Sequence, residues 1–288
     1  MNDATVLQKL ELMFPDKKVE ILYRLMGGMS NYTYVVQIGS NKYTYRIPGE
    51  YSEHFVNRQV EIENIKILEP LGITNKTVYF SVETGEKLAL FVEGTSLNQL
   101  QGEFPYQEVS ELLKVIHESG KVATNDYDPF GRLSTYENHI KELGYVHPEA
   151  YHQTKKHFLS YKPFLDRTPK VLCHGDSQPS NFVFHEGKLM TVDFEFCGNN
   201  DPLYDIACFA NMKLEHGEKL LNTYFLSPTK EEKMRFYLWR AFQCLQWYNV
   251  AIFKEMKGMS ITLHIDFKMV AEKYLEKAQA LLEIVAKI

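Results

Sequence analysis

The chain has 288 residues, of which 44% are hydrophobic and 24% are charged, so it can bury a substantial core and disorder is not expected. Its net charge of −5 argues against a nucleic-acid-binding protein, which usually carries a basic stripe. A chain of this length is expected to form one unit of two lobes or two small domains.

The first part of the chain reads mainly as strands and turns. Helical spacing of apolar residues predicts a helix over residues 5–13, which ends near Pro15. Alternating patterns predict five strands, at residues 21–25, 32–38, 42–47, 77–81 and 87–92. A helical pattern over residues 60–71, followed by Gly72, predicts one inserted helix. These elements predict a five-stranded antiparallel sheet with a helix inserted in it.

After Gly94 the pattern becomes mostly helical. Helices are predicted at residues 109–117, 136–143, 150–165, 234–256 and 266–286. A short β-rich island, residues 171–196, lies between the third and the fourth of them. We therefore expect an α+β fold with a small antiparallel β lobe over residues 1–94 and a large, mainly helical lobe over residues 95–288.

Cysteine spacing and hydrophobicity indicate the compartment. The four cysteines lie far apart and form no CxxC or Cys/His metal spacing, so free thiols in a reducing compartment are expected. Residues 1–18 mix charged and apolar residues, unlike a signal peptide, and no apolar run approaches the length of a membrane span. We expect a cytoplasmic protein that binds no nucleic acid and does not span a membrane. The sequence leaves the oligomeric state open.

The β-rich island carries the strongest functional pattern. His174, Asp176 and Asn181 follow the spacing H-x-D-x4-N, and Asp193 stands twelve residues after Asn181. Phosphoryl transfer requires a carboxylate that accepts the proton of the attacking hydroxyl, and oxygen ligands that hold magnesium on the phosphates. Asp176 fits the base. Asn181 and Asp193 fit the ligands, because a hairpin over residues 182–192 would bring them together. The alternative is a surface hairpin with incidental polar residues, but the full spacing is rare.

A glycine turn lies between the first two predicted strands. It consists of Gly27, Gly28, Met29, Ser30 and Asn31. Glycines let a backbone approach phosphate closely, and small polar side chains add hydrogen-bond donors. The turn matches neither the Walker loop nor the dinucleotide-binding fingerprint. By itself, an ordinary hairpin turn explains it equally well.

Arg46 and Glu61 form a second candidate pair. Arg46 lies on a predicted strand and is placed to reach nucleotide phosphates, and Glu61 at the start of the inserted helix is placed to hold it there. The alternative is two solvated charges on a small lobe, and the pair alone favours that alternative.

Aromatic residues gather on the helix predicted over residues 234–256. They are Trp239, Trp247, Tyr248 and Phe253, and Tyr204 precedes this helix in the chain. Aromatic faces with carboxylates form cages for quaternary ammonium groups. Aromatics on an amphipathic helix usually belong to the core, so we expect most of these to be core and one or two to line a pocket.

Together, these motifs resemble the choline/ethanolamine kinase family, within the protein-kinase-like phosphotransferases that include the aminoglycoside kinases. The similarity covers nearly the whole chain and is closest to bacterial choline kinases. It rests on residues 27–32, on Arg46, on residues 57–61, 71–72, 174–181 and 193–195, and on residues 200–207. One departure concerns the two tryptophans, three residues apart, that are common in choline kinases: Trp247 matches the first, but Val250 stands at the second. Tyr204 also replaces a frequent tryptophan, so the resemblance implies a thinner or rearranged ammonium cage.

The resemblance implies a bilobal protein-kinase-like fold that uses ATP and Mg²⁺. The N-terminal lobe is expected to bind the nucleotide beneath the glycine turn, near Arg46 and Glu61. The adenine is expected against the connector, which includes Phe91, Val92 and Glu93. The implied acceptor is a small amino alcohol, choline first, which would yield phosphocholine and ADP. Ethanolamine, an aminoglycoside, thiamine or another small alcohol remains open as the acceptor.

The resemblance also implies roles for residues outside the nucleotide site. The C-terminal lobe is expected to carry catalysis and acceptor binding. Acceptor binding is expected of Glu195, Tyr204, Trp247 and Tyr248. His174 and Asp205 are expected to support the catalytic residues, and Asp205 to brace the catalytic loop. A pseudokinase without turnover is the alternative from another class, and the intact Asp176, Asn181 and Asp193 argue against it.

Overall fold

The computed structural model describes residues 3–25, 31–185 and 187–288, and the chain forms two compact units. Unit 1 consists of Met1–Gly102 and Ser180–Phe196, and unit 2 of Glu103–Pro179 and Cys197–Ile288. This division differs from the continuous one expected, because the hairpin of the β-rich island joins unit 1. Strand β6 (Thr95–Ser96) pairs with β8 (Phe182–His185), which itself pairs with β9 (Lys188–Thr191).

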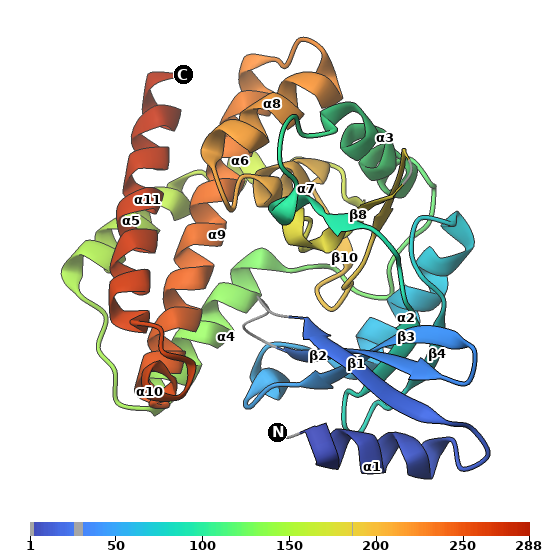
Figure 1. The fold of residues 1–288 in the computed structure, drawn as a ribbon. Coiled ribbons are helices and arrows are strands. Elements are labelled where there is room, and N and C mark those ends of the chain that lie inside the picture. The colour runs from blue at the N-terminus through green and yellow to red at the C-terminus, as the bar shows by residue number, and fades with distance from the viewer. Residues whose placement is uncertain (1–2, 26–30, 186) are drawn as a thin grey trace. The chain divides into compact units, whose positions relative to one another are not determined.

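Unit 1 is built on the predicted five-stranded sheet, which is confirmed. Its strands are β1 (Val19–Leu25), β2 (Asn31–Ile38), β3 (Asn41–Pro48), β4 (Thr77–Phe80) and β5 (Lys87–Leu90). They lie in the order β1-β2-β3-β5-β4, with every neighbouring pair antiparallel. Helix α1 (Asp3–Met13) packs on one face of this sheet, where Val6 and Leu10 are buried with Tyr34 and Val36 (Figure 1). The two-residue spacing of Tyr34 and Val36 places them on the same face of β2.

The inserted helix α2 (Arg58–Leu68) lies between β3 and β4 in the chain. It begins two residues before the predicted start, because the Asn57 side chain caps it by accepting a hydrogen bond from Val60 N at 3.2 Å. A short 3₁₀ turn, Glu69–Leu71, and Gly72 with a φ of 69° end it. Helix α2 buries Glu61 together with Ile65 and Leu68, so it carries one charged residue on its apolar face.

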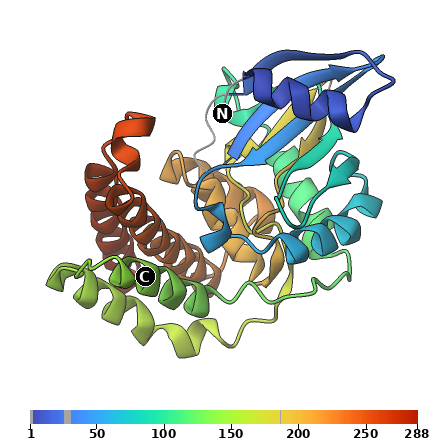
Figure 2. The ribbon, with the colours of Figure 1, turned by 90° about the horizontal axis from the view of Figure 1, so that it is seen from below.

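Unit 2 is mainly helical. Its helices are α3 (Tyr106–His117), α4 (Pro129–Glu142), α5 (Glu149–Ser160), α6 (Lys162–Leu165), α7 (Pro202–Phe209), α8 (Leu214–Phe225), α9 (Lys230–Met256), α10 (Met259–Leu263) and α11 (Phe267–Lys287). Helices α9 and α11 lie side by side, as both ribbon views show (Figures 1 and 2). A Thr229–Glu232 capping box starts α9. Two short strands, β7 (Val171–Cys173) and β10 (Gly198–Asn200), pair antiparallel beside the helices.

The five predicted helices of this unit are present, with the one expected over residues 150–165 divided into α5 and α6. Helices α7, α8 and α10 were not predicted. None of the helices within the described ranges is long and apolar enough to cross a membrane.

Candidate active site

The base of the β8–β9 hairpin brings Asn181 and Asp193 together. Phe182 pairs with Thr191 in the first register position of the hairpin. The Asn181 carbonyl accepts hydrogen bonds from Val192 N at 2.9 Å and from Thr191 Oγ1 at 3.0 Å. Asp193 follows directly, so the predicted return of the chain to Asn181 is confirmed. The hairpin therefore brings these two residues, each with a side-chain oxygen, close together within unit 1.

Asp193 has an unusual backbone conformation. Its φ of 69° lies in the left-handed region, which costs energy for a residue with a side chain. Short polar residues such as Asp and Asn tolerate this region best, and strained residues are concentrated at functional sites. The Asp193 side chain is 31% exposed. The conformation is consistent with a carboxylate that is held for binding.

The charged cluster of unit 1 consists of Asn31, Arg46, Arg58, Glu61, Lys87, Asp193 and Glu195. At its centre, Arg46 makes two hydrogen bonds to Glu61, of 2.6 and 3.0 Å, and Arg46 NH1 lies 3.3 Å from Asp193 Oδ1. Arg46 and Glu61 are both buried, so they are not the two solvated charges of the alternative interpretation. The bidentate pair fixes the plane of the Arg46 guanidinium beside Asp193.

Glu195 belongs to the same charged cluster. Its Oε2 lies 3.1 Å from Arg58 NH1 and accepts a hydrogen bond from Asn31 Nδ2 at 3.1 Å. Arg58 NH1 also lies 2.7 Å from Glu61 Oε2, so one guanidinium serves two carboxylates. The resemblance had assigned Glu195 to the acceptor. The structure shows its carboxylate bonded to Asn31 and Arg58 of unit 1, and the acceptor role stays a prediction.

The protonation states in the charged cluster differ between its carboxylates. Burial, and then the carboxylate of Asp193, raise the pKa of Glu195 to about 7 despite the nearby Arg46. Burial also acts to raise the pKa of Glu61, but the charge and hydrogen bonds of Arg46 outweigh it, and the pKa of Glu61 is lowered. Burial and Arg46 lower the pKa of Lys87. Glu61 is therefore the firmly ionised partner of Arg46, whereas Glu195 titrates near neutral pH.

In unit 2, Asp205 on helix α7 organises the loop that follows β7. Its Oδ2 accepts a hydrogen bond from His174 N at 2.7 Å, and its Oδ1 accepts one from Gly175 N at 2.9 Å. Ser177 Oγ donates to the Asp205 carbonyl at 2.6 Å. The fully buried Asp205 thus holds the backbone of the loop on both sides of Gly175. These are the bonds that the expected bracing role requires.

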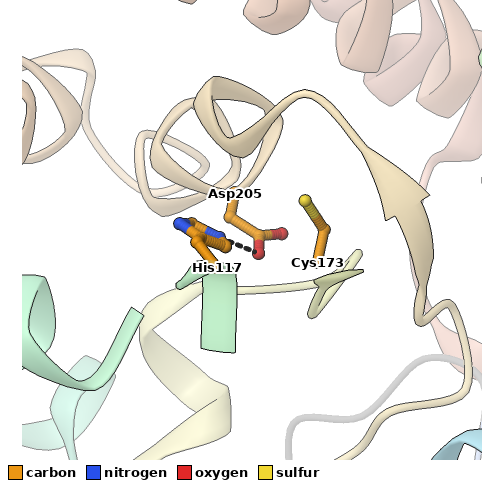
Figure 3. Close-up of side chains that lie close together, drawn as sticks. All are labelled: His117, Cys173 and Asp205. Carbon is orange, nitrogen blue, oxygen red and sulfur yellow. Dashed lines mark hydrogen bonds and ion pairs between the residues drawn. The ribbon is translucent and has the colours of Figure 1, made fainter. Parts of the chain in front are cut away.

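His117 on helix α3 completes the surroundings of Asp205. Its Nε2 lies 3.0 Å from Asp205 Oδ2 (Figure 3). Its Nδ1 lies 3.0 Å from Tyr224 Oη. Burial acts to raise the pKa of Asp205, but the hydrogen bond and charge of His117 and the N–H of Gly175 outweigh it, so the pKa is lowered. Asp205 is therefore an ionised, fully hydrogen-bonded carboxylate.

Cys173 lies beside His117 and Asp205, and the possible ligand atoms of the three lie within 4.8 Å of one another (Figure 3). The Cys173 thiol donates toward the carbonyls of Asn200 at 3.5 Å and Asp201 at 3.6 Å. Burial and then Asp205 raise the pKa of this thiol well above its usual value. The bonds from Cys173 to these carbonyls and the contact of His117 with Asp205 make this group a hydrogen-bonded support for the loop.

Asp176 is half-buried on the loop that Asp205 holds. Its backbone N donates to His174 Nδ1 at 3.2 Å, so the buried His174 ring supports the turn at Asp176. Its Oδ2 accepts from Gln178 Nε2 at 3.1 Å, and its Oδ1 accepts from Cys208 Sγ at 3.6 Å. Neither Gln178 nor Cys208 was expected at the site. Cys208 is 32 positions from Asp176, so its contact leaves no local pattern, whereas Gln178 lies only two positions away, within the H-x-D-x4-N spacing.

The expected adenine connector runs along the edge of unit 1. Phe91 N donates to the Lys42 carbonyl at 3.1 Å, and Glu93 pairs with Lys42 Nζ at 2.8 Å. Phe91 and Val92 are half-buried, and Glu93 is exposed. In the glycine turn, Gly27, Gly28, Met29 and Ser30 lie outside the described residues, and Asn31 is the first residue of β2.

Most of the candidate acceptor aromatics belong to the core of unit 2. Tyr204 and Tyr248 are each 2% exposed, and their hydroxyls bond those of Tyr127 at 2.6 Å and Tyr145 at 2.9 Å. Trp247 is only half-buried. Of the three candidates, Trp247 therefore offers the most ring surface.

Arg58 is a further member of the charged cluster that the residue patterns did not assign. A local signal exists, because Arg58 and Glu61 have the i, i+3 spacing that places opposite charges together on a helix. His117 gives no such signal, because its partner Asp205 is 88 positions away in the chain.

Comparison with known proteins places the chain in a family. A family model described as choline/ethanolamine kinase matches residues 22–236. The protein LicA of Haemophilus influenzae is 26% identical over 225 residues, which are 75% of this chain and 66% of that protein, just under two thirds of its length.

Solved structures share the fold. A crystal structure titled choline kinase LicA from Streptococcus pneumoniae aligns with a TM-score of 0.79 at 23% identity, covering 97% of this chain and 99% of that one. A LicA structure in complex with AMP aligns with a TM-score of 0.77 at 22% identity, covering 98% of each chain. These likenesses, together with similar alignments to aminoglycoside phosphotransferases, confirm the expected kinase-like α+β fold. Because the family model covers most of its length, the chain belongs to the choline/ethanolamine kinase family, a family of small-molecule kinases.

Proposed function

We propose that this protein transfers the γ-phosphate of ATP to the hydroxyl of choline, giving phosphocholine and ADP. The observation that carries the proposal is the return of the chain at the base of the β8–β9 hairpin, which brings Asp193 back toward Asn181 and beside a fixed Arg46. Similarity to proteins named LicA, one titled a choline kinase and one bound to AMP, supports the acceptor and the adenine nucleotide. We assign the nucleotide to unit 1, and the base and the acceptor to unit 2.

The residues at the hairpin base fit a magnesium ion. An amide oxygen of Asn181 and a carboxylate of Asp193 are the hard oxygen donors that Mg²⁺ prefers. When bound, Mg²⁺ neutralises charge that builds up on the β- and γ-phosphates. Arg46 is held by Glu61 and adds a fixed positive charge beside this position.

In the proposed reaction, Asp176 accepts the proton of the acceptor hydroxyl. The hydroxyl oxygen forms a bond to the γ-phosphorus while the bond between that phosphorus and the β–γ bridging oxygen breaks, and ADP leaves with the bonding electrons. Asp205 and His174 hold the loop so that the carboxylate of Asp176 keeps its position. The carboxylate of Asp176 is therefore held in place within unit 2.

Ethanolamine is the second candidate acceptor. A quaternary ammonium makes no N–H hydrogen bonds, so charge and aromatic faces must select it. The burial of Tyr204 and Tyr248 leaves Trp247 as the more exposed ring among the candidates, and a thin cage favours an acceptor that can donate hydrogen bonds.

A panel assay tests the proposal. Purified protein with ATP and Mg²⁺ is given choline, ethanolamine, thiamine or an aminoglycoside, and ADP release and product mass are measured. The proposal predicts the highest kcat/KM for choline and no activity after chelation of the metal. A higher kcat/KM for ethanolamine would replace choline as the acceptor. ADP release that no acceptor increases would contradict the kinase assignment.

A further inference from the structure

A chain of side-chain hydrogen bonds leads from the interior of unit 2 to Asp176. Arg240 NH2 on helix α9 donates to Asn211 Oδ1 at 3.1 Å, and Asn211 Nδ2 donates to Gln178 Oε1 at 2.9 Å. Gln178 Nε2 then donates to Asp176 Oδ2 at 3.1 Å. Gln178 lies two positions from Asp176, whereas Asn211 and Arg240 are distant from both in the chain. We call this chain the Arg240 relay.

The two ends of the Arg240 relay determine which atom of each amide donates and which accepts. A guanidinium only donates and an ionised carboxylate only accepts, whereas an amide can turn either way. Arg240 therefore requires the oxygen of Asn211, so the nitrogen of Asn211 faces Gln178. The oxygen of Gln178 faces that nitrogen, and its own nitrogen is left for Asp176. Both amide orientations are determined by a cation at one end and an anion at the other.

Arg240 is well suited to such a role. It is 3% exposed, and no carboxylate among the described residues forms an ion pair with it. Its second hydrogen bond runs from Nη1 to Gln243 Oε1 at 3.0 Å. The amide of Gln243 is held in this orientation, because its Nε2 donates to the Tyr204 carbonyl at 2.9 Å. Burying a cation is costly unless its donors are used. The amides that receive these donors make Arg240 a rigid starting point.

We propose that Arg240 and Asn211 are positioning residues that make the amide of Gln178 donate to Asp176 and so fix the orientation of its carboxylate. This rests on the proposed function, in which Asp176 is the base. The relay acts on Oδ2, while Cys208 donates to Oδ1, so both oxygens of the carboxylate have donors from unit 2.

The substitution Asn211→Asp tests the relay with a change of one atom. The new carboxylate can still accept from Arg240, so the fold is expected to persist, but it cannot donate to Gln178. The Gln178 amide would then turn its nitrogen toward the new carboxylate and its oxygen toward Asp176. We expect kcat to fall about 10- to 100-fold, because small misplacement of a catalytic group is costly, with the KM for ATP changed less than about twofold.

A double-mutant cycle separates positioning from general packing. Gln178→Leu removes the donor to Asp176, so adding Asn211→Asp to it should lower kcat by less than about twofold further. If the two losses in kcat multiply, or if Asn211→Asp alone leaves kcat unchanged, the relay is wrong. Asn222→Asp is the matched control, because Asn222 is exposed on α8 and should tolerate the same change.

Asp176→Asn, measured in parallel, separates the relay from the proposed function. If this variant keeps its activity, Asp176 is not the base, and the proposed mechanism and the relay fall together. If it is inactive while Asn211→Asp keeps the full kcat, only the relay is overturned.

Discussion

Two buried carboxylates, Glu195 in unit 1 and Asp205 in unit 2, have pKa values that are shifted in opposite directions. Burial acts to raise the pKa of each. The pKa of Glu195 is raised to about 7, whereas the pKa of Asp205 is lowered. Asp205 receives two backbone N–H donors and His117, whereas Glu195 shares Arg58 with Glu61 and lies near Asp193. The donors and charges around a carboxylate, more than its depth, decide its charge.

The opposite pKa shifts of Glu195 and Asp205 match two different roles of these carboxylates. The backbone bonds of Asp205 hold a loop in one shape, which a catalytic base requires. The charged cluster of unit 1 contains carboxylates that compete for the same guanidinium groups, so its protonation and ion pairs can respond to a bound cation or phosphate. The following substitutions test whether the two regions behave in these two ways.

The largest effect is expected for Asp193→Asn in the charged cluster. Asn tolerates the left-handed backbone at this position, where φ is 69°, so the change removes the charge with little strain. Loss of this ligand should lower magnesium-dependent turnover by about 10³-fold, the scale of a lost electrostatic contact at a reacting group. Turnover over a magnesium titration measures it, with the exposed Asp166→Asn as control. Unchanged turnover at ordinary magnesium would show that the ligand assignment is wrong.

Arg46→Ala should damage both stability and nucleotide binding. It leaves Glu61 buried without its bidentate partner, which should lower the free energy of unfolding by about 3–5 kcal/mol. In protein that remains folded, the KM for ATP should rise more than the KM for the acceptor. Denaturant unfolding and steady-state kinetics measure the two effects. A larger rise in the acceptor KM would remove Arg46 from the nucleotide site.

Glu195→Gln should change how stability depends on pH. Glu195 ionises near its ordinary pKa of 4.5 in the unfolded protein and near a pKa of about 7 in the folded protein, so the wild type loses stability as pH rises through this window. The variant lacks this loss and should gain up to about 3 kcal/mol relative to the wild type between pH 4.5 and 8. Denaturant unfolding without magnesium measures the difference.

Asp205→Asn is the opposite case and serves as the comparison. The folded-state pKa of Asp205 is lowered, so its ionisation stabilises the fold above its unfolded pKa, and this contribution is lost only as pH falls through the folded value. At neutral pH the variant should therefore be less stable than the wild type. If Glu195→Gln and Asp205→Asn changed the free energy of unfolding in the same direction at neutral pH, the distinction between the two carboxylates would be contradicted.

The smallest effect is expected at Trp247 in unit 2. If its exposed ring faces the acceptor, Trp247→Phe should keep most of the choline affinity, and Trp247→Leu should lose about tenfold, or 1.4 kcal/mol. The KM for ATP should not change in either variant. The same choline KM in both variants, with a change in stability alone, would place Trp247 in the core.

The sheet and the hairpin could be predicted because their signals are local. Alternating residues such as Tyr34 and Val36 mark β2, and the spacing from Asn181 to Asp193 is that of a tight hairpin. Helix α7 could not be predicted from periodicity, because nearly all of its side chains are buried and no polar face repeats. Helix α8 contains Gly217, a poor helix former. A Cβ there would lie 2.5 Å from that of Ala210, so the glycine serves packing that the sequence does not show.

The candidate site could be predicted where the spacing of residues along the chain brings them together. It could not be predicted where contacts between distant parts of the chain do so. Asn181 with Asp193 and Arg46 with Glu61 are brought together as expected. Cys208 beside Asp176 and His117 beside Asp205 lie on helices α7 and α3, far away in the chain, so these two contacts follow only from the fold. Burial of Tyr204 likewise depends on Tyr127, which is 77 positions away.

The most direct test of the account is the turnover of Asp176→Asn. The substitution keeps size and shape but removes the proton acceptor, so kcat should fall by about 10²- to 10⁴-fold, the usual contribution of a positioned base. The thermal midpoint and the affinity for ATP should remain those of the wild type. This combination would identify Asp176 as the base of a kinase. Turnover near that of the wild type in a folded variant that binds ATP would contradict the central claim.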